Sequence, residues 1–408
     1  MKSNYKPLGD FIEEINIKNK DLKEDNLLGV SISKKFIPSI ANTHGTNFKN
    51  YKVIKYNQFA YGPVTSRNGD KISIALLKEK SGIISSSYKV FKIIDEKILC
   101  PDYLMLWFER EEFDRYARFK SHGSVREIFS WEELSNTLIP VPDIEIQQKI
   151  VKIDKVIRNR IRIKEELNNN LEKIVLSLFS NWFVYFEPFK NISFVDSDFG
   201  FIPEDWKIGT IGDYCKLKSG FAFKSAWWQE EGTKVIKIKD INQGNIDLTD
   251  CSCVSDDKLD KASEFKVIGG DLLIAMTGAT LGKFSIVPKY DEPLYVNQRV
   301  GKFLLGKNPI EKLPFLWSLL NQRRIFDEII NRGQGSAQPN VSPTDIETIS
   351  IILPSDEVIN QFNKECLDIF QLMINNSYEI SQLTKLRDAL LPKLMSGEID
   401  ISEINCDL

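Results

Sequence analysis

The chain has 408 residues, of which 42% are hydrophobic, so it can bury substantial cores and is expected to form two or three domains. Charged residues make up 27% of the chain and the formal net charge is only −3, which excludes a protein whose whole surface is basic. The six cysteines lack the spacing of a disulfide framework or a zinc site, and no segment has the roughly 18 apolar residues of a membrane span. We therefore expect a cytoplasmic protein that does not contact a membrane.

Residues 1–144 mix short apolar runs with Gly, Asn and Asp turns, a pattern that predicts a β-rich head with some helix. Residues 145–187 follow a Pro-Val-Pro stop and are predicted to form a long helix. Its apolar residues recur mostly at steps of three and four, the spacing of a coiled-coil seam. They are Ile146, Ile150, Ile153, Ile157, Ile161, Leu167, Leu171, Ile174 and Leu178.

Residues 188–355 show the same mixture, including the alternating run Lys234–Lys239, and predict a second β-rich head. Residues 356–402 predict a second long helix, and residues 403–408 a short tail. The seam of this helix consists of Phe362, Cys366, Ile369, Met373, Ile380, Leu383, Leu386 and Leu390.

A shift of 212 positions superposes one half of the sequence on the other, and it matches glycine and serine punctuation as well as apolar residues. We interpret this repeat as the duplication of a whole head-plus-helix module. The matched pairs include Phe91 with Phe303, Gly123 with Gly335 and Ser130 with Ser342, and with a slightly smaller offset Leu8–Phe11 with Ile211–Tyr214.

One polar residue interrupts each helical seam at an equivalent place, Lys164 in the first copy and Asn376 in the second. A polar residue at a core position costs stability and fixes the register of a coiled coil, although the Lys164 amine could equally reach out to solvent. Equivalent residues of two antiparallel helices meet only near the pseudo-twofold axis that relates them. We therefore expect Lys164 and Asn376 to face each other. The predicted coiled-coil core is Ile150, Ile157, Lys164, Leu171, Phe362, Ile369, Asn376 and Leu383.

These patterns predict an α+β fold in which two similar β-rich globular heads are separated by two long helices that form an antiparallel coiled coil. Helices of about 33–37 residues span about 50 Å at 1.5 Å per residue. If each head reads DNA, the two heads are paired readers held at a fixed separation by the helices. The distance between the heads would then set the spacing of the two DNA half-sites. Because the heads differ in sequence, the half-sites should differ as well.

Three stretches resemble type I restriction-modification specificity subunits. Leu178–Phe189 is similar to the end of their central conserved helix, Gly200–Trp206 with Ile211–Asp213 to the start of a target recognition domain, and Leu386–Ile399 to their C-terminal conserved region. The resemblance covers nearly the whole chain. It implies target recognition domains at 1–144 and 188–355, a central conserved helix at 145–187 and a C-terminal conserved helix at 356–402.

The resemblance also implies a function and partners. Each head would read one half of an asymmetric bipartite site in double-stranded DNA, and the helices would dock two modification (methyltransferase) subunits, which restriction (helicase-nuclease) subunits join. No cofactor is expected on this chain. S-adenosylmethionine, ATP and Mg are expected in the partner subunits. The heads vary within the family, so the resemblance transfers no base-contacting residue.

Candidate DNA-contacting residues come instead from loops rich in hydrogen-bond donors and small residues. Such loops are also the ordinary turns of a β-rich domain, so for a single loop the turn alone is a sufficient explanation. In the first head the candidates are Arg67, Asn68, Lys71, Ser86, Lys120, Ser121, Gly123, Ser124 and Arg126. In the second head they are Lys218, Ser219, Lys224, Thr277, Thr280, Lys283, Gln298, Arg299, Gln334, Gly335, Ser336 and Gln338.

Catalytic functions are poorly supported by the sequence. It lacks the glycine-rich turn and adenine-site motif of a methyltransferase, and the nearest match to a nuclease motif is Glu264-Phe265-Lys266 with Asp250 or Asp257 upstream. One Glu-x-Lys is expected by chance among 57 acidic residues. We predict neither a catalytic nor a metal site. The competing hypothesis is a coiled-coil scaffold whose two heads bind other proteins.

Overall fold

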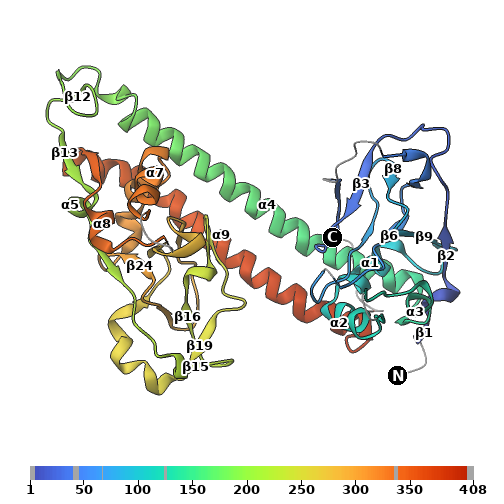
Figure 1. The fold of residues 1–408 in the computed structure, drawn as a ribbon. Helices are drawn as coiled ribbons and strands as arrows, with labels where there is room; N and C mark the ends of the chain where they lie inside the picture. The colour runs from blue at the N-terminus through green and yellow to red at the C-terminus, as the bar shows by residue number, and fades with distance from the viewer. Residues whose placement is uncertain (1–4, 40–45, 67, 124–125, 335–338, 402–408) are drawn as a thin grey trace. The chain divides into compact units, whose positions relative to one another are not determined.

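The computed structural model of the chain describes residues 5–39, 46–66, 68–123, 126–334 and 339–401 and divides into two compact units. Unit 1 consists of residues 1–159 and 384–408, and unit 2 of residues 160–383. Each unit therefore combines one head with parts of two long helices, α4 (Ile144–Phe183) and α9 (Asp356–Ser396), both of which are unbroken (Figure 1). Within the ranges that the structure describes, no helix has the length and apolar character needed to cross a membrane.

The head of unit 1 is built from two four-stranded sheets, with strand orders β2-β9-β6-β7 and β4-β3-β8-β5, and from short helices. Neighbouring strands run antiparallel except β3 and β8, which are parallel. The strands are β1 (Tyr5–Pro7), β2 (Ile12–Ile15), β3 (Leu27–Val30), β4 (Phe36–Pro38), β5 (Lys52–Ile54), β6 (Phe59–Tyr61), β7 (Ile74–Leu76), β8 (Gly82–Ile84), β9 (Lys89–Ile93) and β10 (Leu138–Pro140). The helices are α1 (Pro101–Glu109), α2 (Glu111–Phe119) and α3 (Trp131–Ser135).

The head of unit 2 has sheets with strand orders β14-β24-β21-β22 and β15-β19-β16-β23-β20, and β16 and β23 are again parallel. Its strands are β11 (Phe194–Val195), β12 (Ile202–Pro203), β13 (Lys207–Thr210), β14 (Leu217–Ser219), β15 (Trp228–Gln229), β16 (Thr233–Ile236), β17 (Ile241–Asn242), β18 (Asn245–Ile246), β19 (Ser252–Val254), β20 (Lys266–Val267), β21 (Leu272–Ala275), β22 (Phe284–Ile286), β23 (Leu294–Val296), β24 (Val300–Phe303) and β25 (Ser350–Leu353). Its helices are α5 (Ile211–Tyr214), α6 (Leu313–Leu320), α7 (Arg323–Arg332) and α8 (Pro343–Glu347).

The central strand of each head is buried on both faces, because successive side chains of a strand point to opposite sides. In β6, Phe59 and Tyr61 pack into the core beneath α1 and α2, whereas Ala60 packs against the second sheet. In β21, Leu272 and Ile274 belong to the helix-side core, and Leu273 and Ala275 to the sheet-side core. These short apolar runs therefore lack the polar alternation of a half-exposed strand.

The internal repeat holds for the helices that follow the sheets. Shifting α1, α2, α3 and α4 by 212 positions places them on α6, α7, α8 and α9, with starting residues that coincide. Equivalent serines also cap α3 and α8, since Ser130 Oγ accepts from Glu133 N at 3.1 Å and Ser342 Oγ from Asp345 N at 3.2 Å. The predicted α+β fold with two similar β-rich heads is confirmed.

The two long helices pack antiparallel within each unit. In unit 2, Arg160 Nε donates to Glu379 Oε1 (2.7 Å) and Lys164 Nζ to Asn376 Oδ1 (3.0 Å), so residue numbers rise along one helix as they fall along the other. In unit 1, Ile150 of α4 packs in one core with Leu394 of α9. The antiparallel coiled coil is confirmed, and the repeat-related pair Lys164 and Asn376 is in direct contact.

The seam predicted along the helices is wrong at three positions. Leu167 and Ile174 of α4 are 38% and 54% exposed, and Leu386 of α9 is 47% exposed. Val175 and Phe179 are buried instead, because this part of α4 packs against the core of the second head as well as against α9. A straight helix also drifts relative to a heptad repeat, so one fixed stripe cannot face the partner along 40 residues.

Candidate nucleic-acid interface

The loops singled out in the second head lie together at one edge of unit 2. The turn that contains Gln298 and Arg299 occupies the middle, between the segment after β14 and the segment after β21. Backbone hydrogen bonds join these segments to one another and to the chain that follows α7: Gln298 N to Phe221 O (2.9 Å), Met276 N to Arg299 O (3.0 Å), Gly278 N to Pro339 O (2.9 Å) and Val341 N to Met276 O (2.9 Å).

Unit 1 repeats this arrangement. The loop after β6 is bridged to the segment before α3 by Phe129 N to Pro63 O (2.8 Å) and Thr65 N to Glu127 O (3.0 Å). Both bonds correspond, with a shift of 212 or 213 positions, to the bridges in unit 2. Thr65 Oγ1 also donates to Ser121 Oγ at 2.9 Å, which ties the loop to the end of α2. Two loops that are distant in sequence therefore form one edge in each head.

Two glycines at these edges are required by backbone geometry. Gly123 has a φ of +146°, and a Cβ atom there would lie 2.0 Å from Arg126 O. A Cβ atom on Gly220 would lie 2.4 Å from the carbonyl oxygens of Val296 and Asn297. Close backbone packing therefore explains why these two positions are glycine. A glycine there does not by itself indicate a DNA contact.

The candidate residues of unit 2 divide by their surroundings. Gln298, Arg299, Lys224 and Gln334 are exposed, whereas Ser219 and Lys283 are half-buried and Thr277 is buried. The hydroxyl groups of Thr277 and Thr280 are buried without a hydrogen-bond partner in the described chain. Lys218 is paired with Glu264 at 2.8 Å and lies over the ring of Phe265, and Lys224 lies 5.6 Å from the ring centroid of Trp227.

In unit 1 the exposed candidates are Lys71, Ser86, Gly123 and Arg126. Three others are engaged in internal contacts, since Asn68 Nδ2 donates to Val64 O (3.4 Å), Lys120 Nζ lies 3.6 Å from Glu133 Oε2, and Ser121 is buried and donates to Ala117 O (2.7 Å). Ser86 lies in a turn closed by Tyr88 N to Ser85 O at 3.0 Å, the counterpart of the Asn297–Val300 turn of unit 2. The remaining candidates, Arg67, Ser124, Gly335, Ser336 and Gln338, lie outside the described residues.

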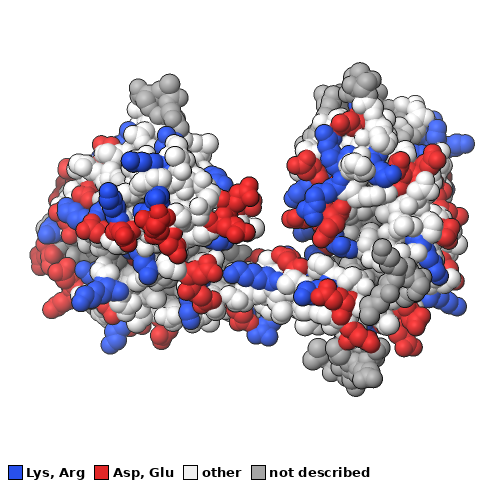
Figure 2. All heavy atoms as spheres, turned by 90° about the horizontal axis from the view of Figure 1, so that it is seen from below, with Lys and Arg blue, Asp and Glu red and all other residues white. Residues whose placement is uncertain are grey.

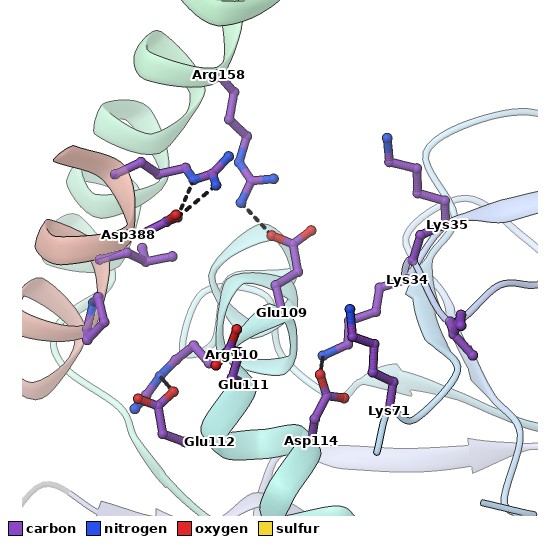
Figure 3. Close-up of a pocket in the computed structure, with 15 residues that line it drawn as sticks. Lys34, Lys35, Lys71, Glu109, Arg110, Glu111, Glu112, Asp114, Arg158 and Asp388 are labelled. Atoms are coloured by element: carbon purple, nitrogen blue, oxygen red, sulfur yellow. Dashed lines mark hydrogen bonds and ion pairs between the residues drawn. The ribbon is translucent and has the colours of Figure 1, made fainter. Parts of the chain in front are cut away.

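A cleft of about 560 Å³ lies in unit 1 beside the Lys71 segment, between the β3–β4 turn, the α1–α2 corner and the two long helices (Figure 3). At its base Lys34 Nζ donates to Asp114 Oδ2 (2.9 Å) and to Phe108 O, and Asp114 Oδ1 accepts from Ile72 N (3.1 Å). Burial lowers the pKa of Lys34, whereas its pairing with Asp114 opposes that shift. This buried pair fixes the backbone next to Lys71.

Most charged groups that line the cleft are neutralised within the chain. Arg158 donates to Asp154 (2.6 Å) and to Glu109 (2.5 Å). Burial lowers the pKa of Arg158, but the two carboxylates outweigh burial, so the pKa is raised above its usual value. Lys35 and Lys71 are exposed and have no ion pair within the described ranges. Lys35 could not be predicted from the sequence, because a lone lysine in a turn looks the same in sequence whether it binds a ligand or is only solvated.

The predicted coiled-coil core is buried to different degrees. Ile150, Ile157, Phe362 and Asn376 are buried, and Lys164, Leu171, Ile369 and Leu383 are half-buried. Asn376 Nδ2 donates to Asn168 Oδ1 at 2.9 Å, and Lys164 Nζ lies 2.7 Å from Glu379 Oε2, so the polar positions form a hydrogen-bonded layer between the helices.

Charges of both signs are interspersed over the face drawn in Figure 2, in keeping with the small net charge. Glu264 of the Glu-x-Lys match pairs with Lys218, and Asp257 pairs with Lys258. Among the residues that could be described, no group of three or more His, Cys, Asp and Glu side chains has the arrangement of a metal site.

The fold and the loops together define a class of protein with two similar heads. Each head has an edge formed by donor-rich loops, and each is followed by a long helix that packs antiparallel against the other. The family model of the type I restriction modification DNA specificity domain matches residues 2–173 and 203–387. The chain therefore belongs to the family of type I restriction-modification DNA specificity proteins and carries its domain twice.

Individual relatives agree with this assignment. The chain is 29% identical over 361 residues to the type I restriction enzyme MjaIX specificity subunit of Methanocaldococcus jannaschii, covering 86% of this chain and 76% of the relative. It is 23% identical over 437 residues to the HindI specificity subunit of Haemophilus influenzae, covering 91% and 93%. The crystal structure of a type I S subunit from M. genitalium matches 98% of this chain and 96% of its own length, with a TM-score of 0.57 and 16% identity, a likeness of fold.

Proposed function

We propose that this protein is the DNA specificity subunit of a type I restriction-modification system and has no catalytic activity of its own. It recognises an asymmetric bipartite target and directs methyltransferase and restriction subunits to it in the cytoplasm. The observation that carries the proposal is the bridged loop edge that recurs in both heads, built from equivalent backbone hydrogen bonds but different side chains.

The repeat separates two kinds of DNA contact. Lys71 and Lys283 occupy equivalent positions, and each closes a turn. The Lys71 amide donates to Asn68 O at 3.4 Å, and the Lys283 amide donates to Thr280 O at 3.0 Å. A lysine shared by both heads suits a phosphate contact, which carries no sequence information. A different pair of equivalent positions, 86 and 298, holds the exposed side chains of Ser86 in the first head and Gln298 in the second. Side chains that differ in this way suit two different half-sites.

Partner docking is supported by the surface of α4. Ile163, Leu167 and Ile174 are 50%, 38% and 54% exposed on one helix of unit 2, and apolar side chains grouped at a surface are typical of a protein contact. We assign this surface to one of two modification subunits, with restriction subunits joining the complex. S-adenosylmethionine, ATP and Mg would be bound by these partners.

Methylome sequencing of the source cells with and without this gene tests the proposal. One bipartite adenine-methylation motif should disappear on deletion and return on complementation. A Lys71→Ala/Lys283→Ala variant should lower methylation at every site with the motif unchanged, because phosphate contacts are not sequence-specific. Unchanged methylation after deletion, in cells whose methyltransferase partner is active, would favour the protein-binding scaffold instead.

The second part of the test addresses the independence of the heads. Replacing residues 1–144 with the head of another specificity subunit should change one half-site and leave the other intact. Adding one helical turn to both α4 and α9 should change the spacer length permitted between the half-sites. A change in both half-sites on the head exchange, or a constant spacer on helix extension, would contradict the proposal.

A further inference from the structure

The β23–β24 turn of unit 2 holds its backbone rigidly and leaves two side chains free to project. Val300 N donates to Asn297 O (2.8 Å) and closes the turn, and Arg299 N lies 3.4 Å from Asn297 Oδ1. Gln298 N and Arg299 O are bonded to Phe221 and Met276 on either side. The side chains of Gln298 and Arg299 are exposed, so the turn presents them in a fixed position.

Arg299 differs from the basic side chains around it. Lys218 is paired with Glu264 at 2.8 Å, Lys302 with Asp271 at 2.6 Å, and Arg332 with Glu328 at 2.9 Å. Arg332 also donates to the Thr348 hydroxyl group at 2.6 Å. The Arg299 guanidinium has no acceptor in the described part of the chain. Its five N–H donors are therefore available to an external acceptor.

We infer that Arg299 reads a guanine in the half-site recognised by the second head, through paired hydrogen bonds to guanine O6 and N7 in the major groove. This inference rests on the proposed function and adds to it one base and the residue that selects it. A planar guanidinium matches the two acceptors of guanine, whereas adenine, cytosine and thymine do not offer that pair.

The fixed backbone distinguishes this role from a phosphate contact. A phosphate oxygen is reached equally well by a flexible lysine, and Lys283, half-buried and two residues after the bridged Thr277–Leu281 segment, already supplies a cation to this edge. Base reading instead requires that the donor approach the base edge in one orientation. The hydrogen bonds made by the backbone of the Asn297–Val300 turn supply that orientation before DNA binds.

The test compares wild type with Arg299→Ala, Arg299→Lys and the matched control Arg323→Ala, each co-expressed with the methyltransferase partner in a host free of other adenine methylation. Arg323 lies on α7 of the same head and its side chain is 89% exposed, but it already pairs with Asp327. Long-read sequencing gives each methylation motif. Fluorescence anisotropy of the purified complexes, with duplexes that carry each base pair at the affected position, gives the affinities.

The wild-type motif should contain a G·C pair that Arg299→Ala makes degenerate, in one half-site only. The wild-type preference for guanine at that position should be about 5- to 150-fold and should vanish in the variant. Arg299→Lys should keep the affinity for duplexes without guanine at that position and should weaken the preference for guanine, because it keeps the charge without the planar fork. Arg323→Ala should match wild type in both measurements.

Three results would overturn the inference while leaving the proposed function intact: uniformly lower methylation with an unchanged motif, relaxation at an A·T pair, or no change at all. Absence of any bipartite motif in wild type would instead count against the proposed function. Thermal unfolding of the purified variants verifies folding. If Arg299→Ala unfolds early, Arg299→Lys alone decides the outcome by the same criteria.

Discussion

Asn376 lies at the centre of the polar layer between α4 and α9, and the Asn376→Ala substitution tests whether that layer stabilises the helix pair. The side chain is 2% exposed, accepts from Lys164 Nζ at 3.0 Å and donates to Asn168 Oδ1 at 2.9 Å. A hydrogen bond to a charged group contributes about 1.5–3 kcal/mol, and a neutral one about 0.5–1.5 kcal/mol. Their sum is an upper limit for the loss in unfolding free energy.

The actual loss should be smaller, because both partners keep other contacts. Lys164 retains Glu379 Oε2 at 2.7 Å and is 19% exposed, and Asn168 Nδ2 retains Met373 O and Ser377 Oγ, each at 3.2 Å. Only Asn168 Oδ1 and part of the Lys164 charge are left without a partner. We therefore expect a loss of about 2 kcal/mol in the unfolding free energy of unit 2.

Urea unfolding followed by tryptophan fluorescence measures this loss, since five of the seven tryptophans lie in unit 2. Asn375→Ala is the matched control, because Asn375 is the neighbouring asparagine on the exposed side of α9 and should change stability by about 0.5 kcal/mol or less. A double-mutant cycle with Lys164→Met should give a coupling of about 1 kcal/mol. Equal effects of Asn376→Ala and Asn375→Ala, or zero coupling to Lys164, would refute the stabilising role.

Three further predictions concern other parts of the molecule. Lys34→Met should lower the unfolding free energy of unit 1 by about 3 kcal/mol, because it leaves Asp114 buried without its charge partner, and Lys34→Met/Asp114→Leu should recover part of that loss in thermal unfolding. Burial raises the pKa of the Cys366 thiol to about 12, so iodoacetamide at pH 8 should modify Cys366 only after unfolding, as measured by mass spectrometry. Hydrogen bonds from the Ser342 backbone and side chain lower the pKa of Asp345 in the folded protein, so its contribution to stability is complete above about pH 4 and is lost as the pH falls further. The melting temperatures of wild type and Asp345→Asn should therefore differ at neutral pH, and the difference should shrink as the pH falls below about 4.

The repeat is the part of the sequence that predicted most of the fold. Once Gly123 was matched to Gly335 and Ser130 to Ser342, the register of every later element in the second half followed from the first. The facing pair Lys164 and Asn376 followed in the same way, since an antiparallel arrangement brings only one repeat-related pair together. The 3-residue strands, by contrast, are too short for periodicity to define their ends.

The site could be predicted only as a set of loops. Sequence identified the donor-rich turns but not which of their side chains are already engaged, such as Lys218 with Glu264, 46 residues away in the chain. The pair Lys34 and Asp114 is separated by 80 residues and has no local pattern at all. The exposure of Leu167 and Ile174 was missed because a helical stripe does not reveal whether α4 faces another helix, a head or solvent.

The duplication itself offers a way to separate residues that support the heads from residues that read DNA. Positions where both halves keep the same chemistry and the same contact, such as the caps Ser130 and Ser342, are explained by folding alone. Positions on the bridged edges where the halves differ are free of that constraint. Arg299 has Ser87 as its counterpart in the first head, so its guanidinium is not required by the shared fold. A side chain that the fold does not need, held on a backbone that the fold keeps rigid, is where two diverging heads would acquire different base preferences.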